Sequence, residues 1–569
     1  MTDDGPAVGL VGSGPALDAV RAALGDVDVA PVETSADALG AHDLAVVIAP
    51  TGAGAFADAD AAADRWIAVE VGGIGGRPLG DVDAAVTVLG EVRHADLRTR
   101  VAASGVAAAE RPRGDRAAVR LAGAVAGRRA VASLAGADVD GTLVEVTGTD
   151  VVGPREVLPA PDAPPDRTLR RDARDASLDD AAGRAERAVD DRVGIVTEVG
   201  ERESFPAPYY LANVADVAPL SDARASIRAA GVAADWNAAF VKALGEALER
   251  YAAGVYRADW FDVAPERTRA APVSPARFAR PEGFRPPDPA EPIPWVAGEN
   301  LQTGDRVDLP AEFVQYPPPA ERHRPAITTG LGLGSDGAGA LLSGLYEVIE
   351  RDATMVAWYS SYEPLELAVE DEAYATLARR ARAEDLSVAP LLVTTDVDVP
   401  VVAVAVHREG AWPGFAVGSA AALDAGVAAR GALAEALQNW MELRAMGPDG
   451  AATAGGAIAE YADLPEAARA FVDADGPVPA ASVGPDDPPT GTDELAAVVD
   501  RVTDAGLDAY AARLTTADLG DMGFEAVRVV VPEAQPLFTG DPFFAERAET
   551  VPRELGYEPR LDRAYHPYP

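Results

Sequence analysis

The stretch Gly339-Ala-Leu-Leu-Ser-Gly-Leu-Tyr-Glu-Val-Ile-Glu-Arg-Asp352 is predicted to be a helix with charges on two faces. Glu347 and Glu350 are three residues apart, so both carboxylates lie on one face. Asp352 falls among apolar residues on the other side, where a carboxylate needs a partner. The preceding residues 328–337 are rich in glycine. We expect them to form a flexible loop before a helix N-terminus, where anions bind readily.

Two more segments carry charge in the same way. The predicted helix over residues 236–251 places these side chains opposite an apolar stripe: Lys242, Glu246, Glu249 and Arg250. The predicted helix over residues 427–442 gathers on one side Arg430, Glu435, Gln438 and Glu442. Lys242 is the single lysine among 49 basic residues. Surface ion pairs are the simplest interpretation of such faces.

Carboxylates three residues apart on facing helices can also bind a hard cation through oxygen. Nearby arginine, lysine and backbone N–H groups can hold phosphates. The pattern therefore predicts a magnesium–nucleotide site in one cavity, formed by Glu246, Glu249, Glu347, Glu350, Glu435 and Gln438. The chain contains no G-x-x-x-x-G-K-[ST] sequence, so a P-loop is not the source of this site.

The charged residues of the sequence limit the kinds of molecule that the protein can bind. The 569 residues contain 91 Asp and Glu against 49 Lys and Arg, for a formal charge of −42. A negative field of this size repels nucleic acid and anionic membranes, so we expect neither as a partner. Acidic residues spread along the whole chain are typical of a halophilic protein, whose salt-rich cytoplasm screens self-repulsion.

Features that the sequence lacks indicate the cellular compartment of the protein. Cysteine is absent, which excludes disulfides and cysteine-ligated zinc. No apolar run reaches the roughly 18 residues that a membrane span needs. The acidic start, Met1-Thr-Asp-Asp-Gly, has no basic region of the kind that opens a signal peptide. We therefore expect a soluble cytoplasmic protein.

The first part of the chain, residues 1–95, alternates short apolar runs with helical stretches, which predicts a small Rossmann-like α/β domain. Gly12-Ser-Gly14 with Glu33 resembles a dinucleotide fingerprint, but Leu17 replaces its third glycine. A scaffold without a nucleotide is favoured, and cofactor binding is the alternative. A second glycine cluster, residues 72–76, is expected to form a turn.

The remaining chain divides at a proline-rich segment. Residues 96–177 are rich in Ala, Arg and Asp and include the proline run at 158–165, so we expect a linker region. Residues 178–569 alternate strands and helices and are expected to form a large α/β domain. The predicted class is therefore α/β, with a large ATP-binding domain preceded by a small Rossmann-like domain.

The charged helices, in this order, resemble the YcaO family over residues 178–569. Residues 347–352 match its E-V-I-E-R-D element throughout. The S-x-x-x-E-x-x-E-R element is matched by Glu246, Glu249 and Arg250, with Lys242 where the family usually has serine. The R-A-x-x-E-x-x-Q element is matched by Arg430, Glu435 and Gln438. The end, His566-Pro-Tyr-Pro569, is similar to the proline-rich tail of azoline-forming members.

The resemblance implies an enzyme that uses ATP and Mg²⁺ to phosphorylate a backbone amide oxygen in a ribosomally made peptide or protein, giving azoline heterocycles. It implies that nucleotide is bound by Lys242, Glu246, Glu249, Arg250, Glu347, Glu350, Arg351, Arg430, Glu435 and Gln438. It implies that metal is bound by Glu246, Glu249, Glu347, Glu350 and Glu435. The catalytic residues that it implies are Arg430, Pro567 and Pro569, the prolines placing the terminal carboxylate as a base.

The N-terminal part resembles the fused E1-like or docking part of cyclodehydratases, but no peptide-clasping element is identified in it. Partners compatible with the resemblance are a peptide or protein substrate, a separate peptide-binding or sulfur-delivery protein, and a second copy in a homodimer. Two other functions stay open. One is a thioamide-forming or sulfur-transfer accessory enzyme, and the other is a scaffold of the same fold without catalysis.

Overall fold

The computed structural model of the chain describes residues 6–454 and 460–568. It contains two compact units. The first comprises Met1–Asp162, Glu186–Glu198 and Val214–Ser221, and the second comprises Ala163–Ala185, Val199–Asn213 and Asp222–Pro569. Both combine helices with strands, which confirms the predicted α/β class. None of the described helices is long and apolar enough to cross a membrane.

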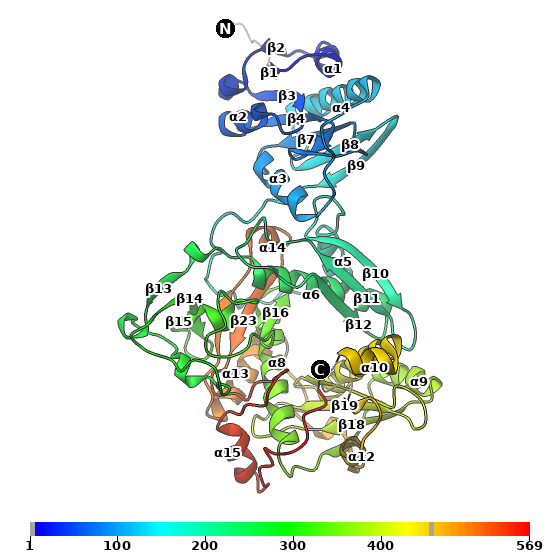
Figure 1. The fold of residues 1–569 in the computed structure, drawn as a ribbon, viewed down its shortest axis with the longest axis vertical. Helices are drawn as coiled ribbons and strands as arrows, with labels where there is room; N and C mark the ends of the chain where they lie inside the picture. Colours follow the sequence, from blue (N-terminus) through cyan, green and yellow to red (C-terminus); the bar gives the residue numbers. More distant parts are fainter. Residues whose placement is uncertain (1–5, 455–459, 569) are drawn as a thin grey trace. The chain divides into compact units, whose positions relative to one another are not determined.

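A seven-stranded sheet organises the first unit, in the order β2-β1-β3-β4-β7-β8-β9 (Figure 1). Its strands are β1 (Ala7–Val11), β2 (Ala30–Glu33), β3 (Leu44–Pro50), β4 (Trp66–Val71), β7 (Ala84–Leu89), β8 (Thr142–Thr147) and β9 (Asp150–Glu156). The first four pair in parallel and the last three continue antiparallel. One face is covered by α1 (Pro15–Leu24) and α4 (Arg116–Leu134), the other by α2 (Gly54–Ala62) and α3 (His94–Ala103).

The structure differs from the linker expected at residues 96–177. Helix α4 and strands β8 and β9 lie inside that range and complete the layers of the sheet. Helix α4 packs on α1 so closely that a Cβ on Gly123 would lie 2.3 Å from the Ala16 carbonyl oxygen. The sequence concealed this helix because its buried face is mostly Ala and Gly, which give only a weak apolar periodicity.

The glycines of the fingerprint-like turn serve packing. Gly12 has a φ of 122°, and a Cβ there would lie 2.3 Å from the Ile48 carbonyl oxygen of β3. Glu33, at the end of β2, forms an ion pair with Arg21 of α1. Leu17 is buried in the core between α1 and the sheet. These contacts account for the motif without a dinucleotide.

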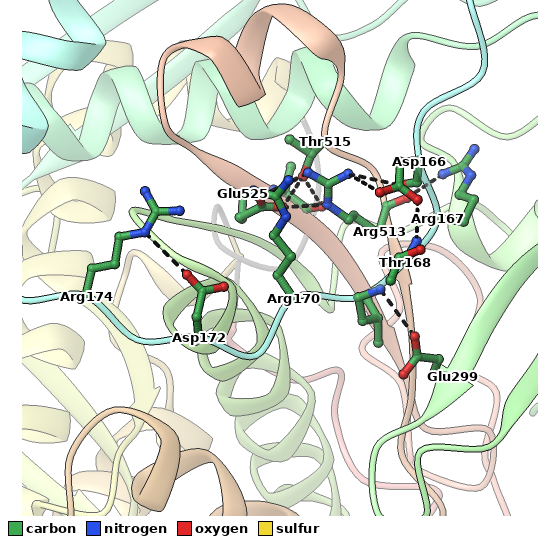
Figure 2. Close-up of polar contacts among 12 residues, drawn as sticks. Asp166, Arg167, Thr168, Arg170, Asp172, Arg174, Glu299, Arg513, Thr515 and Glu525 are labelled. Atoms are coloured by element: carbon green, nitrogen blue, oxygen red, sulfur yellow. Dashed lines mark hydrogen bonds and ion pairs between the residues drawn. The ribbon is translucent and has the colours of Figure 1, made fainter.

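The last part of the expected linker, residues 163–177, lies as an extended arm on the second unit (Figure 2). Arg170 pairs with Glu525, a buried carboxylate that also pairs with Arg513 at 2.6 Å. The Arg174 backbone N–H donates to Asp336, the residue that caps the next long helix. The arm is extended, as its prolines predict, but charge pairs and backbone hydrogen bonds fix its course.

Three further sheets come from the later part of the chain: β10-β11-β12, β13-β14-β22-β23-β16 with β15 beside β14, and β20-β19-β18-β17-β21. Their strands are β10 (Val196–Glu203), β11 (Tyr209–Val214), β12 (Arg228–Val232), β13 (Asp262–Pro265), β14 (Pro292–Asn300), β15 (Arg306–Pro310), β16 (Leu331–Gly334), β17 (Leu365–Ala368), β18 (Ser387–Leu392), β19 (Val401–His407), β20 (Phe415–Ala421), β21 (Asp475–Pro479), β22 (Tyr510–Arg513) and β23 (Glu525–Val530). The hairpin of β5 (Gly73–Ile74) and β6 (Arg77–Pro78) stands apart in the first unit.

Helices pack on these sheets and carry the charged motifs. They are α5 (Leu178–Glu186), α6 (Trp236–Gly254), α7 (Ala311–Val314), α8 (Gly337–Trp358), α9 (Glu372–Ala383), α10 (Ala425–Ala454), α12 (Glu466–Val472), α13 (Thr492–Asp504), α14 (Ala517–Asp521) and α15 (Arg547–Glu554). Short 3-10 turns are η1 (Ala36–Ala41), η2 (Ala258–Trp260), η3 (Glu266–Thr268), η4 (Pro275–Arg277) and η5 (Ala480–Ser482). Helix α10 bends at Gly447, which precedes Pro448.

The expectation of a flexible glycine loop before α8 is wrong, because residues 331–334 form strand β16. Its glycines allow α8 to lie against the sheet: a Cβ on Gly332 would be 2.2 Å from the Ala340 carbonyl oxygen. Asp336 caps α8 by accepting the Gly339 N–H at 2.7 Å. This N-terminal donor is therefore taken by the chain's own carboxylate rather than left for an anion.

Asp352 has the partner that its position on an apolar helix face demands. Its carboxylate accepts two hydrogen bonds from Arg547 of α15, at 2.8 and 3.1 Å, and one from the Gln535 backbone N–H. Both charged side chains are buried. Their pairing ties α8, which carries Glu347 and Glu350, to the C-terminal part of the chain.

We expect Arg547→Met to lower the free energy of unfolding by about 3–5 kcal/mol, because it leaves the Asp352 carboxylate buried without its counter-charge. Arg553→Ala, on the same helix, is the matched control. It removes an exposed pair with Glu549 and should cost only about 0–1 kcal/mol. Urea unfolding of both variants measures the difference, and equal losses would contradict a structural role for the buried pair.

Candidate functional site

A cavity of about 790 Å³ in the second unit brings the three charged helices together. Its lining comes from α6, α8 and α10, with contributions from β16, β20 and α5. The predicted residues that line it are Lys242, Glu246, Glu249, Arg250, Glu347, Glu350, Arg351, Glu435 and Gln438. The six carboxylate and amide side chains expected to converge therefore do so in the structure.

Helix α6 presents its polar face to the cavity because its other face is buried. Asp235 caps the helix, and a Cβ on Gly231 of β12 would lie 2.2 Å from the Ala243 backbone nitrogen. This close strand holds Glu246, which accepts the Ala230 N–H at 2.8 Å and an Arg250 N–H at 3.0 Å. The expected apolar stripe is shifted at its start, since Trp236 is largely exposed.

Lys242 lies at the exposed rim of the cavity lining. The alternative role, an ion pair with Glu246 one turn later, is not formed within the described chain, because Glu246 pairs with Arg250 instead. Among the described residues Lys242 has no carboxylate within ion-pair distance. Its ammonium is free to contact a ligand.

Helices α8 and α10 meet through strand β20. Glu350 accepts a hydrogen bond from the Ser419 hydroxyl at 2.6 Å, and Glu435 accepts the Ser419 backbone N–H at 2.7 Å. Arg351 lies between the two carboxylates, 3.4 Å from Glu350 and 3.6 Å from Glu435. Sequence reasoning missed Ser419, although a serine in an otherwise apolar strand was the available signal.

Glu442 is a second residue that the prediction left outside the site. It lines the cavity and accepts hydrogen bonds from Gln438 at 3.1 Å and from the Tyr209 hydroxyl at 2.8 Å. Its position four residues after Gln438 on the same helix face was visible in the sequence. Tyr209 comes from β11, so only the structure places it there.

The carboxylates are crowded enough to alter their protonation. Burial raises the pKa of Glu249 to about 8, and the neighbouring Glu347 contributes to this rise. Burial also raises the pKa of Glu350, with Glu435 adding to the effect and Arg351 opposing it. Like charges this close are stable as anions only when a cation joins them. The cavity is therefore built for positive charge from a ligand.

The donor set fits a magnesium–nucleotide complex. Arg351 lines the cavity with its Nε and one terminal nitrogen buried and without a hydrogen-bond acceptor among the described residues. Such nitrogens suit phosphate oxygens. Within residues 6–454 and 460–568, no three His, Asp or Glu side chains form a ready-made metal cluster. Mg²⁺ commonly combines one or two carboxylates with phosphate oxygens and water, which agrees with this arrangement.

Arg430 was predicted to act in the site, but it does not line the cavity. Its guanidinium pairs at 3.0 Å with Asp371, the residue that caps α9. The prediction followed the motif, in which Arg430 shares a helix face with Glu435. The structure shows that α9 supplies a closer acidic partner, so the side chain is held by that pair.

The C-terminal tail approaches the same cavity wall. Pro567 is buried but is not among the lining residues, and Pro569 lies outside the described residues. Tyr568 is buried as well, and burial raises the pKa of its phenol, with Glu350 and Arg351 close enough to affect it. The Trp358 indole donates to the Ala564 carbonyl at 2.8 Å and fixes the approach of the tail.

Known proteins share this fold. A heterocyclase solved in complex with substrate and cofactor aligns with a TM-score of 0.73 and 18% identity, over 97% of this chain and 83% of its own. The heterocyclase TruD aligns with a TM-score of 0.67 and 16% identity, over 97% and 82%. YcaO from Methanopyrus kandleri, bound with AMPPCP and Mg²⁺, has a TM-score of 0.47 and 25% identity, over 60% and 86%.

A comparison with curated protein sequences found no match. The model of one protein family, described as YcaO cyclodehydratase, ATP- and Mg²⁺-binding, matches residues 230–535, which include all three charged helices. This match covers more than half of the chain and confirms the resemblance and the expected cofactors, ATP and Mg²⁺. The chain belongs to the YcaO family.

Proposed function

We propose that this protein activates a backbone amide of a peptide with ATP and Mg²⁺ and forms azoline heterocycles. The observation that carries the proposal is the convergence of glutamates from α6, α8 and α10 around Arg351 in one cavity. The family's description as a cyclodehydratase supports the reaction type. Heterocyclases are among the proteins that share the fold along nearly the whole chain.

The chemistry explains the need for a phosphoryl donor. A Cys, Ser or Thr side chain of the peptide adds to the preceding carbonyl carbon, which leaves an oxygen that departs poorly. Transfer of a phosphoryl group from ATP to this oxygen lets it leave as phosphate while the nitrogen loses its proton and the C=N bond forms. The net change in the peptide is the loss of one water. Bound Mg²⁺ neutralises the charge that develops on the phosphates.

The cavity residues have distinct tasks in this proposal. Glu249 and Glu347 are the leading candidates for metal ligands, because their mutual repulsion is relieved by a cation. Arg351 offers phosphate oxygens its Nε, which has no hydrogen-bond acceptor among the described residues. Ser419 positions Glu350 and Glu435 and touches no substrate itself.

The product distinguishes azoline formation from its alternatives. The full chain is co-expressed with peptides that contain Cys, Ser or Thr, and the products are weighed. Azoline formation lowers the peptide mass by one water for each residue converted. Thioamide formation exchanges oxygen for sulfur and raises the mass. Of the two products, the proline-containing tail favours the azoline.

Glu347→Gln is the matched negative control for this experiment, because it keeps the size of the side chain and removes the charge. We expect it to abolish the mass loss. A water loss that persists in Glu347→Gln would contradict catalysis in this cavity. Binding of ATP and Mg²⁺ without any change in peptide mass would favour the non-catalytic scaffold.

We expect Lys242→Ala to weaken nucleotide binding by about tenfold to a hundredfold while the protein stays folded, because an unpaired ammonium at the rim can contact a phosphate. Lys242→Arg retains the positive charge and should bind nucleotide nearly as tightly as the natural protein. Calorimetric titration of Mg²⁺–ATP measures both variants. Unchanged affinity in Lys242→Ala would show that the single lysine is dispensable.

We expect Mg²⁺–ATP binding to release protons at pH 7. A carboxyl group whose pKa lies near 8, as for Glu249, holds its proton at pH 7 and must lose it to bind a cation. Affinity should therefore rise with pH between about 6 and 8. Titration in two buffers of different ionisation enthalpy counts the protons. Glu249→Gln should reduce the release, with Glu350 supplying what remains, whereas Glu442→Gln, from the same cavity, should leave the release unchanged.

A further inference from the structure

The first unit contains a second cavity, of about 470 Å³, that the proposed reaction does not use. One wall is the β5–β6 hairpin with its turn, residues 73–78, and another is the face of α3 that carries Arg98 and Thr99. Pro219 contributes from a later segment of the same unit. The second glycine cluster of the sequence, residues 72–76, contributes Gly75 and Gly76 to the lining of this cavity.

Two arginines line this cavity without counter-charges. Arg77 extends from β6, and its Nε is buried without a hydrogen-bond acceptor in the described part of the chain. Arg98 is exposed, and its Nε would lie 3.4 Å from a Cβ placed on Gly76. Neither guanidinium has an ion pair with a described residue. Unpaired guanidinium groups beside one cavity suit carboxylate or phosphate oxygens.

The backbone of the hairpin turn is fixed by hydrogen bonds, which set the position from which the Arg77 side chain extends. The buried Glu70 carboxylate accepts the N–H groups of Gly75 at 2.7 Å and Gly76 at 2.8 Å. It also accepts the Thr51 hydroxyl at 2.6 Å and contacts His94 of α3 at 3.0 Å. A turn whose backbone is already fixed binds with a smaller entropy cost than a mobile one.

Glycine at these positions brings α3 to the hairpin. Gly75 has a φ of 56°, and a Cβ there would lie 2.9 Å from the Leu97 carbonyl oxygen. Any larger residue would push α3 away and separate Arg98 from Arg77. The glycine cluster at 72–76 is therefore more than a turn, because it sets the spacing of the two arginines.

The charge around the cavity is opposite to that of the protein. Residues 93–113, which comprise α3, the residue before it and the segment after it, contain five arginines and two acidic residues, within a chain of net charge −42. Four more arginines follow in α4, on the opposite face of the sheet, and complete a basic segment over residues 93–134. Part of this segment packs on the hairpin, where the Ala109 N–H donates to the Pro78 carbonyl at 2.8 Å. Arg111 and Arg113 follow directly and are exposed. A local basic surface of this kind attracts acidic groups over several ångströms.

We propose that this cavity and its basic rim bind the carboxylates of an acidic peptide segment. That the segment belongs to a peptide substrate rests on the proposed function. The two guanidinium groups would each donate hydrogen bonds to a carboxylate, and the exposed arginines beside them would attract further acidic residues. The first unit would thus hold a substrate by charge at a site of its own, with no cofactor or reaction step involved.

The test uses the full-length protein and a fluorescein-labelled oligoglutamate peptide, at the lowest salt concentration that keeps the protein folded. Fluorescence anisotropy should show binding of this peptide and none of an oligoglutamine peptide of equal length. Arg77→Gln combined with Arg98→Gln should weaken binding by about tenfold or more. Arg128→Gln removes an exposed arginine of the same basic segment outside the cavity and should change affinity by less than about twofold.

Three results would overturn the proposal. Equal binding of oligoglutamine would show that charge is not recognised. Equal weakening by Arg128→Gln would show attraction to the basic segment as a whole. Binding of inorganic phosphate, measured by calorimetric titration, with no binding of oligoglutamate would assign the site to a free anion. The titration needs neither ATP nor turnover, so its failure and a failure of the proposed reaction are separate results.

Discussion

Arg351, buried between Glu350 and Glu435, is the interaction on which the cavity depends. It links α8 to α10, while Ser419 of β20 binds both carboxylates and fixes their separation. An arginine buried with two glutamates is costly to desolvate and contributes little to stability by itself. We infer that it contributes to specificity instead, because this arrangement of the helices brings all three charges together.

Excess negative charge remains in the cavity after Arg351 is counted. Glu249 and Glu347 repel each other on a second wall, and burial keeps the pKa of Glu249 near 8. A cation relieves this repulsion, whereas bare phosphate would increase it. The cavity therefore suits a ligand that carries both positive and negative charge, and a magnesium–nucleotide complex is such a ligand. The glutamates would bind the cation of this ligand, and the basic side chains would bind its phosphates.

Helix periodicity was enough to predict which glutamates line one cavity, because the spacing of charges on one helix is a local property. Glu347 and Glu350 were placed correctly by counting residues, and the need of Asp352 for a partner followed from its apolar surroundings. The position of Arg430 outside the cavity lining was not predicted, because its partner, Asp371, comes from a helix that no local pattern connects to it. Helix α4 was missed because small residues pack closely without producing a strong apolar stripe.

Linkage between the two cofactors tests the central claim most directly. Calorimetric titration of the full chain with ATP alone, Mg²⁺ alone and both together measures the coupling between phosphate and cation. If the glutamates require a cation before phosphate can enter, ATP should bind at least about tenfold more tightly with Mg²⁺ than without it, and Mg²⁺ alone should bind weakly. Equal ATP affinity with and without Mg²⁺ would contradict the account.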